Sequence, residues 1–222
     1  MRRIQRALTD HNIVCGYGPS GVEAAAELVR RGFKPEQVVI VDRGEAALEE
    51  ALECGYSTVT GDATLNAVLE QAGVERARSL IITAGSDDTA VLIALTARRL
   101  APHVPVAAMI RAEENEVLAH DAGAKIIVNP VSFGGQLLAG CTEGPHIADY
   151  VSDLVTSKGR VKLRERTVAP NEVGRSLREI AGGIGLRIIR AGRPIGFWEA
   201  EAGALAAGDV LIEVVPTAAH EG

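Results

Sequence analysis

The chain has 222 residues, a formal net charge of −6, 47% apolar residues and only 3% aromatic residues. Its length allows one large domain, or a medium domain with a small one, and either can bury a substantial core. An aliphatic composition with few aromatic side chains favours helices packed on a parallel sheet. The acidic balance argues against a nucleic-acid partner, because phosphate binding draws its affinity from clustered lysines and arginines.

The cysteines and the hydropathy pattern indicate a soluble cytoplasmic chain. The three cysteines lack the paired spacing of a metal site, and their odd number fits a reducing compartment. No apolar run approaches the roughly 18–20 residues that span a bilayer. The N-terminus also lacks the apolar core of a secretion signal.

The first ten residues, MRRIQRALTD, differ in pattern from the rest of the chain. Their arginines and apolar residues alternate at a spacing that gives a short helix one basic and one apolar flank. We therefore assign residues 1–10 to a connector.

Six short apolar runs then alternate with helical stretches. The predicted strands are Ile13–Cys15, Val38–Val41, Ser57–Thr60, Leu80–Thr83, Val106–Ile110 and Ile126–Val128. The predicted helices are Gly21–Arg31, Glu45–Leu52, Leu65–Ala72, Thr89–Leu100 and Glu114–Ala122. This alternation predicts an α/β fold with a Rossmann-like, doubly wound parallel sheet.

The helix that contains Ala90–Leu95 has almost no polar face. A helix that is apolar all round must be buried on both sides. It forms either a subunit interface, which we favour, or an inner helix of the monomer.

The pattern changes after Val131. The stretch through Leu154 is broken by paired glycines and by Gly144-Pro145, so it predicts a crossing helix with a kink or a break. Beyond it, short strands at Val161–Val168, Leu186–Ile189 and Val210–Val215 and a short helix at Ser176–Ile180 predict a smaller α+β subdomain. We expect an N-terminal domain over residues 11–145 and a C-terminal subdomain over 146–222.

A glycine-rich loop follows the first strand. The segment Gly16-Tyr17-Gly18-Pro19-Ser20-Gly21 has the spacing G-x-G-x-x-G between a strand and a helix, which is the context that the dinucleotide fingerprint requires. The first glycine allows a tight turn, the second lets the backbone approach a pyrophosphate, and the third allows close helix packing. The helix N-terminus offers N–H groups to the anion. All six residues are candidate ligand contacts.

An acidic residue strengthens this fingerprint. Asp42 ends the second strand, 21 residues after Gly21, where a carboxylate accepts hydrogen bonds from both ribose hydroxyls. Such bonds contribute roughly 1.5–3 kcal/mol each. The same charge repels a 2′-phosphate, so the site favours NAD(H) or an adenine nucleotide (ADP, ATP or AMP) over NADP. Arg43 either contacts phosphate or adenine, or is a solvated surface arginine. The alternative for the whole motif is a fold that kept the loop without the ligand.

Further candidates follow the later strands, at the edge of the sheet where open α/β folds bind ligands. They are Gly61, Asp62, Ala63, Thr83, Ala84 and Arg111. Asp62 either faces the adenosine or caps the next helix. Arg111 is the natural phosphate partner on this rim, or it forms an intersubunit salt bridge.

The sequence offers no catalytic constellation, so we predict that the protein is not an enzyme. Hydride transfer needs a proton donor or acceptor near the reacting carbon, usually histidine, lysine or tyrosine. None of the five histidines has a matched partner, and Glu199 and Glu201 lack other metal-ligating residues. The alternative is a small NAD-dependent oxidoreductase.

Nearly the whole chain resembles an RCK (regulator of potassium conductance) domain, also called the TrkA or KTN type. The residues that carry the resemblance are His11-Asn12-Ile13-Val14-Cys15-Gly16-Tyr17-Gly18, Gly61-Asp62-Ala63-Thr64, Ala72-Gly73-Val74, Ala122-Gly123-Ala124 and Asn129-Pro130. In the tail, Ile188-Ile189-Arg190-Ala191-Gly192 and Gly208-Asp209-Val210-Leu211 resemble the C-terminal ligand-responsive subdomain of that family.

The resemblance implies a nucleotide-sensing gating domain that controls potassium flux from the cytoplasmic side of the membrane. Its partner is either the pore of a channel, with residues 1–10 as the linker, or the membrane subunit of a potassium transporter. Two copies would pair through the crossing helix into a homodimer, and four dimers would form an octameric ring. The helix from Ala90 would belong to the ring contact.

Two positions depart from the family pattern. Many relatives have arginine after the second glycine, where this chain has Pro19, so one phosphate contact is missing. Calcium-gated members carry glutamates near the positions of Gly85 and Thr89, so calcium is not expected at the usual family site. A different cation at Asp62, Asp87 and Asp88 stays open.

Overall fold

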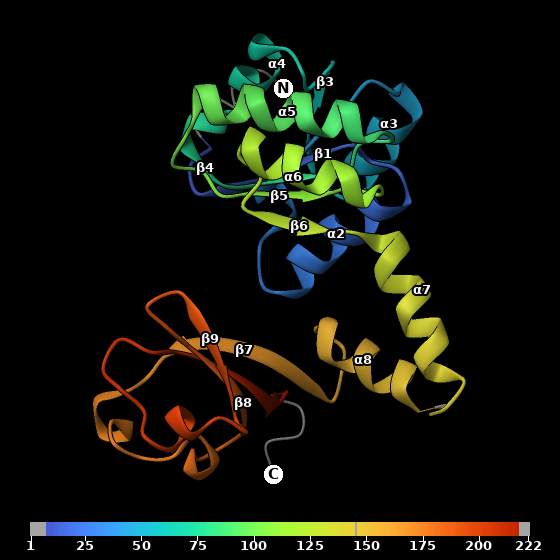
Figure 1. Cartoon of the computed structure of the whole chain (residues 1–222). Helices are drawn as coiled ribbons and strands as arrows, with labels where there is room; N and C mark the ends of the chain where they lie inside the picture. Colours follow the sequence, from blue (N-terminus) through green and yellow to red (C-terminus); the bar gives the residue numbers. More distant parts are fainter. Residues whose placement is uncertain (1–7, 145, 218–222) are drawn as a thin grey trace. The chain divides into compact units, whose positions relative to one another are not determined.

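The computed structural model describes residues 8–144 and 146–217 (Figure 1). The chain divides into two compact units, Met1–Ala139 and Gly140–Gly222. Most of the predicted connector, residues 1–7, lies outside the described residues. No helix among the described residues is long and apolar enough to cross a bilayer.

The first unit is built on a six-stranded sheet with the order β3-β2-β1-β4-β5-β6. Its strands are β1 (His11–Cys15), β2 (Val38–Asp42), β3 (Ser57–Thr60), β4 (Ala77–Ile82), β5 (Val106–Met109) and β6 (Ile126–Val128). All neighbouring strands pair in parallel. The predicted doubly wound parallel sheet is confirmed.

Helices connect successive strands, and Figure 1 shows α5 and α6 together over the sheet. The helices are α2 (Pro19–Arg30), α3 (Glu45–Glu53), α4 (Asn66–Gln71), α5 (Asp87–Leu100), α6 (Glu113–Ala122) and α7 (Pro130–Cys141). Two 3-10 turns, η1 (Pro35–Gln37) and η2 (Val74–Arg76), lead into β2 and β4.

The core explains the apolar runs within the central strands, such as Ile13–Cys15 of β1 and Val38–Val41 of β2. Side chains alternate across a sheet, so a strand that is covered on both faces needs apolar residues at every position. In β1, Ile13 and Cys15 pack into the cluster that α4, α5 and α6 complete, whereas Val14 packs into the cluster of α2 and α3. Every residue of β1 is buried.

Helix α5 buries one face and exposes another. Its small residues Ala90, Ala94 and Ala97 are fully buried and allow close approach to the sheet. Leu92 and Leu95, on the other side of the helix, are 52% and 46% exposed. Because this outer face is exposed in one copy, the alternative that α5 is an inner helix of the monomer is wrong. The role of this face as a subunit interface stays a prediction.

The second unit carries a smaller antiparallel sheet with the order β7-β10-β8-β9, as expected for the C-terminal subdomain. Its elements are α8 (Ile147–Val155), β7 (Val161–Thr167), η3 (Pro170–Glu172), η4 (Leu177–Glu179), β8 (Ile184–Arg190), β9 (Arg193–Gly196), η5 (Ala200–Gly203) and β10 (Val210–Pro216). Strand β9 was not predicted from the sequence. The predicted helix Ser176–Ile180 is only one 3-10 turn, which Ser176 caps by accepting a hydrogen bond from the amide of Arg178.

Buried charges hold this unit together. Glu213 is fully buried in β10, where its Oε1 accepts hydrogen bonds from Arg164 Nε at 2.7 Å and Arg166 Nε at 2.8 Å. Arg166 also donates to both oxygens of Glu172, at 2.6 and 2.7 Å. These bonds lower the pKa of Glu172 to about 2. Some of the alternating charged side chains of β7 therefore point toward the interior of the unit, where they bind buried carboxylates.

Glu172→Gln should lower the free energy of unfolding of the second unit by about 1.5–3 kcal/mol at pH 7, the range for hydrogen bonds to charged groups. The pKa of Glu172 is about 2 when folded and higher when unfolded, so its stabilisation is complete above pH of about 4.5. It is lost as the pH falls toward about 2. The difference between variant and wild type should therefore shrink across that window.

Urea unfolding followed by the fluorescence of Trp198, the only tryptophan, measures this difference. Glu201→Gln is the matched control, because this exposed carboxylate lies 3.7 Å from exposed Arg193. It should change the free energy of unfolding by less than about 0.5 kcal/mol. Equal effects of the two variants would contradict the account of Glu172.

Candidate functional site

A crevice of about 340 Å³ opens at the carboxyl edge of the parallel sheet, next to the ends of β1 and β2. Successive strands are added toward one edge of the sheet from β1 to β3 and toward the other edge from β4 to β6, so the strand order reverses between β1 and β4. Open α/β folds bind ligands at such a switch point. The residues that line the crevice are Cys15, Gly16, Val41, Asp42, Arg43, Gly61, Asp62, Ala63, Ala84, Gly85, Ser86, Thr89 and Ile93.

The glycine loop lies between β1 and α2, as the fingerprint predicts. Gly16 has φ +99°, and a Cβ there would lie 2.8 Å from the carbonyl oxygen of Thr83. A Cβ on Gly21 would collide with the carbonyl oxygen of Gly16. A Cβ on Gly18 would meet nothing within 4 Å. The first and third glycines are therefore required by packing, and the second faces open space.

Pro19 begins α2, with Gly18 as its N-cap residue. Proline suits the first helical turn, but it has no N–H group. The helix end therefore offers an anion one donor fewer than it would with arginine or another residue at this position. Ser20 and Gly21 also belong to this turn, and neither lines the crevice.

Asp42 connects the glycine loop to the second strand. Its Oδ2 accepts a hydrogen bond of 2.7 Å from the amide of Tyr17, and its Oδ1 accepts one of 2.8 Å from the amide of Gly44. A carboxylate has about four acceptor sites, so two remain for other donors. Asp42 thus shapes the loop and lines the crevice with the same group.

The side chain of Tyr17 points away from the crevice. It is buried in the core beneath α2 and α3, and its ring meets that of Tyr56 edge-on at 6.2 Å between centroids. Only its backbone takes part in the loop. This burial anchors the glycine loop to the domain.

Asp62 and Arg43 face each other at the mouth of the crevice. Arg43 Nη1 lies 3.8 Å from Asp62 Oδ2, and the Arg43 side chain is 76% exposed. Asp62 Oδ1 accepts hydrogen bonds from the amide and the hydroxyl of Thr64, and these bonds, with Arg43, lower its pKa. Asp62 therefore stabilises the turn that precedes α4, whose N-cap residue is Leu65, and it does not cap that helix as the alternative predicted. It also lines the crevice, and its contact with adenosine stays a prediction.

Two predicted residues support the crevice without lining it. Thr83 Oγ1 donates to the carbonyl of Gly16 at 2.8 Å. Arg111 Nη1 donates to the carbonyl of Ala84 at 3.1 Å, and its backbone amide donates to Asp87 Oδ1 at 3.0 Å. Both contacts hold walls of the crevice in place, a role that the sequence analysis did not consider for either residue.

Asp87 is the centre of this brace. Its carboxylate is 9% exposed and also accepts from the Ala112 amide at 2.9 Å and from Asn115 Nδ2 at 3.0 Å. Because both oxygens of the Asp87 carboxylate already accept hydrogen bonds from protein donors, few lone pairs remain to bind a cation. Within the described part of the chain, no group of three or more histidine, cysteine, aspartate or glutamate side chains converges as a metal site would require.

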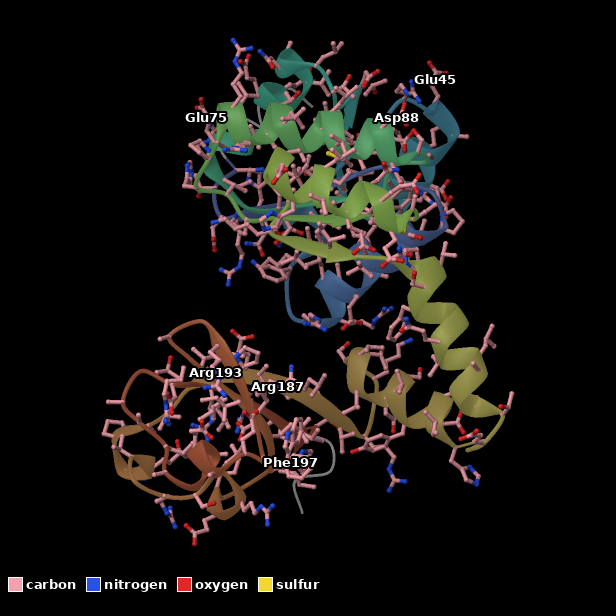
Figure 2. All side chains as sticks on the ribbon, in the orientation of Figure 1. Glu45, Glu75, Asp88, Arg187, Arg193 and Phe197 are labelled. Atoms are coloured by element: carbon pink, nitrogen blue, oxygen red, sulfur yellow. The ribbon has the colours of Figure 1, made fainter. Side chains whose placement is uncertain are left out.

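The start of α5 contributes residues that the sequence analysis did not assign to the ligand. Ser86 and Thr89 line the crevice, and their hydroxyls are 2.9 Å apart. Figure 2 shows Asp88 in the first turn of α5 and Glu45 in the first turn of α3. Their position after β4, a few residues beyond the predicted candidates Thr83 and Ala84, is the signal that could have found Ser86 and Thr89.

Comparison with known proteins gives the family. The TrkA-N domain model matches residues 12–130. Potassium channel protein 1 of Methanocaldococcus jannaschii is 33% identical over 186 residues, which cover 82% of this chain and 54% of that protein. This chain spans about half the length of the curated relatives that it matches first.

Two solved structures extend the comparison. The GsuK channel bound to NAD is 28% identical and has a TM-score of 0.54, with 97% of this chain and 38% of that chain covered. GsuK bound to ADP is 32% identical and has a TM-score of 0.53, with 65% of this chain and 37% of that chain covered. Because the family model covers more than half of the sequence, the chain belongs to the TrkA-N domain family, in agreement with its resemblance to RCK domains.

Proposed function

We propose that this chain is a cytosolic ligand-sensing domain that controls potassium flux through a channel or transporter, and that its signal is a nucleotide bound in the crevice. The observation that carries the proposal is the position of Asp42, which lines the crevice and also bonds the amide of Tyr17 in the glycine loop. A ligand that engages Asp42 acts on the loop directly. The structures of GsuK with NAD and with ADP support this class of ligand.

The proposed ligand is NAD(H) or an adenine nucleotide. Its ribose would lie at Asp42, and its phosphates would lie over Gly16 and Gly18. The adenosine part of the ligand would face Asp62 and Ala63. Pro19 removes one helix donor, and Arg43 is the cation at the mouth of the crevice that remains within reach of phosphate. Asp42 disfavours a 2′-phosphate, as the sequence indicates.

The lining favours binding without chemistry. Among the crevice residues of the described chain there is no histidine, lysine or tyrosine side chain to exchange a proton with a substrate. Cys15 is buried, and burial raises the pKa of its thiol. The oxidoreductase alternative therefore lacks a histidine, lysine or tyrosine side chain among the described residues that line the cavity where its cofactor would lie.

Differential binding is sufficient for gating. Moving a two-state pore from mostly closed to mostly open takes about 5.5 kcal/mol, so eight sites in an octameric ring need about 0.7 kcal/mol each. We propose that two copies form a homodimer, that dimers form this ring at the inner face of the membrane, and that Leu92 and Leu95 of α5 belong to the contact between copies. The membrane partner is a pore in the same chain or a separate transporter subunit.

Asp42→Asn should weaken NAD or ADP binding by about ten-fold or more, because an amide replaces a charged acceptor whose hydrogen bonds contribute roughly 1.5–3 kcal/mol each. Titration calorimetry on the folded proteins measures the affinity. Glu45→Gln is the control, since it removes one charge from the neighbouring first turn of α3 at a residue that does not line the crevice. If both variants bind as the wild type does, Asp42 is not a ligand residue.

Leu92→Glu should reduce the oligomer to a smaller species, from ring to dimer. The melting temperature should stay within a few degrees of the wild type, because this leucine is already half exposed in one copy. Light scattering measures the mass. Leu52→Glu, at a leucine of α3 that is 39% exposed, should leave the mass unchanged. A Leu92→Glu protein that keeps the wild-type mass would exclude this face of α5 from the contact.

A further inference from the structure

Helices α5, α6 and α7 begin at the edge of the parallel sheet where the crevice opens. They follow β4, β5 and β6, whose carboxyl ends lie at one edge because these strands pair in parallel (Figure 1). The start of α5 lines the crevice through Ser86 and Thr89, and Asp87 between them begins the helix. A contact between these helix starts therefore reaches from the wall of the crevice toward α7.

Two neighbouring residues in the first turn of α6 make such contacts in opposite directions. Asn115 Nδ2 donates to Asp87 Oδ2 at 3.0 Å, on the side of α5. Glu116 Oε1 accepts from Asn129 Nδ2 at 2.9 Å, on the side of α7. Both hydrogen bonds are partly buried, which makes them stronger than bonds in open water. This pair of bonds is termed the α6 link.

Asn129 caps the start of α7. Its Oδ1 accepts hydrogen bonds of 3.1 Å from the amides of both Val131 and Ser132. Amides in the first turn of a helix have no acceptor within the helix, so a capping side chain stabilises them. With one side chain, Asn129 therefore joins the first turn of α7 to Glu116 of α6.

The first turn of α7 depends on this cap for its position. None of the twelve residues of α7, all of which the structure describes, is buried in one copy. Apolar packing within the copy therefore does not hold the start of the helix. Segments with few buried contacts open locally at a low cost in free energy. The cap is thus an element with two states, one bonded and one open.

We propose that Asn115, Glu116 and Asn129 are positioning residues that convert nucleotide binding in the crevice into closure of the α7 cap. The inference rests on the proposed function, because it adds a route by which the nucleotide acts beyond its own site. A nucleotide that contacts the start of α5 restrains Asp87. Through the α6 link, a restrained Asp87 favours the bonded state of the cap, and the ligand shifts the equilibrium to the state that it binds better.

The bond of Asn115 is the one that reaches the helix itself. Asp87 also accepts from the amides of Arg111 and Ala112, but both residues precede the first turn of α6. Of these donors, Asn115 alone lies within the turn, next to Glu116. Successive residues of a helical turn are held by the same backbone hydrogen bonds, so a displacement at Asn115 is carried to Glu116.

Hydrogen exchange at the start of α7, with and without nucleotide, tests the α6 link in the full chain. Because Pro130 has no N–H group, exchange over residues 130–133 reports on the amides of Val131, Ser132 and Phe133. NAD or ADP at a concentration that saturates the site should slow this exchange by about five-fold or more, the lower end of the usual coupling between sites. Mass spectrometry measures the exchange, and calorimetry sets the concentration.

Variants of α6 separate a link from a merely structural role. Asn115→Ala should remove most of the slowing by nucleotide, yet leave exchange without nucleotide unchanged, because the cap bonds of Asn129 stay intact. Glu116→Ala should also remove the slowing, whereas Glu116→Gln keeps a carbonyl oxygen for Asn129 and should retain it. Glu114→Ala, at an exposed neighbour in the same turn, is the matched control and should behave as the wild type does.

Calorimetry distinguishes the possible failures, and circular dichroism confirms that each variant is folded. Asn115 and Glu116 do not line the crevice, so their variants should still bind NAD or ADP. A wild type that binds neither nucleotide would overturn the proposed function, and this inference with it. Binding that leaves the exchange over residues 130–133 unchanged, slowing that survives both alanine variants, or an equal loss in Glu114→Ala would overturn the inference alone. If one alanine variant does not fold, the other still decides.

Discussion

The hydrogen bond between Asp42 and the amide of Tyr17 is the contact on which the shape of the crevice depends. At 2.7 Å, it ties the turn after β1 to the end of β2, so the glycine loop is held by a charged group that also lines the cavity. The side chain of Tyr17 is buried in the core, so both its backbone amide and its ring are held in place. A nucleotide that bonds to Asp42 therefore competes with, or reinforces, a contact that already sets the position of the loop.

The opposite wall is held by an independent brace. Asp87 accepts from three donors between Arg111 and Asn115, and Arg111 in turn donates to the carbonyl of Ala84. Thr83 joins the two walls through its bond to Gly16. Walls that are already held in place lose little conformational entropy when a ligand binds. More of the binding free energy is then available to favour one arrangement of the domain over another.

The sequence was sufficient to predict the parallel sheet and the place of the glycine loop, because both follow from local patterns. Strands covered on both faces must be continuously apolar, and Gly16 and Gly21 are required by backbone contacts that only glycine tolerates. Each of the six predicted strands of the first unit overlaps an observed one.

What the sequence did not predict depends on contacts between distant residues. Strand β9 has four residues, one of them Pro194, and exists because it pairs with β8 as an edge strand. Glu213 interrupts the apolar run of β10, and its burial is stabilised by arginines 47 and 49 residues away. Arg111 was expected to contact phosphate or to form an intersubunit salt bridge, and both stay predictions. The bond from its guanidinium to the carbonyl of Ala84, 27 residues distant, is a contact that no local pattern encodes.

Potassium flux through the membrane partner, reconstituted in liposomes with this domain attached, tests the central claim most directly. The account predicts that NAD or ADP at saturating concentration changes the flux and that the nucleotide is recovered chemically unchanged afterwards. Flux that is indifferent to every nucleotide that binds, together with the accumulation of reduced or oxidised cofactor in the presence of a substrate, would contradict the account and favour an oxidoreductase.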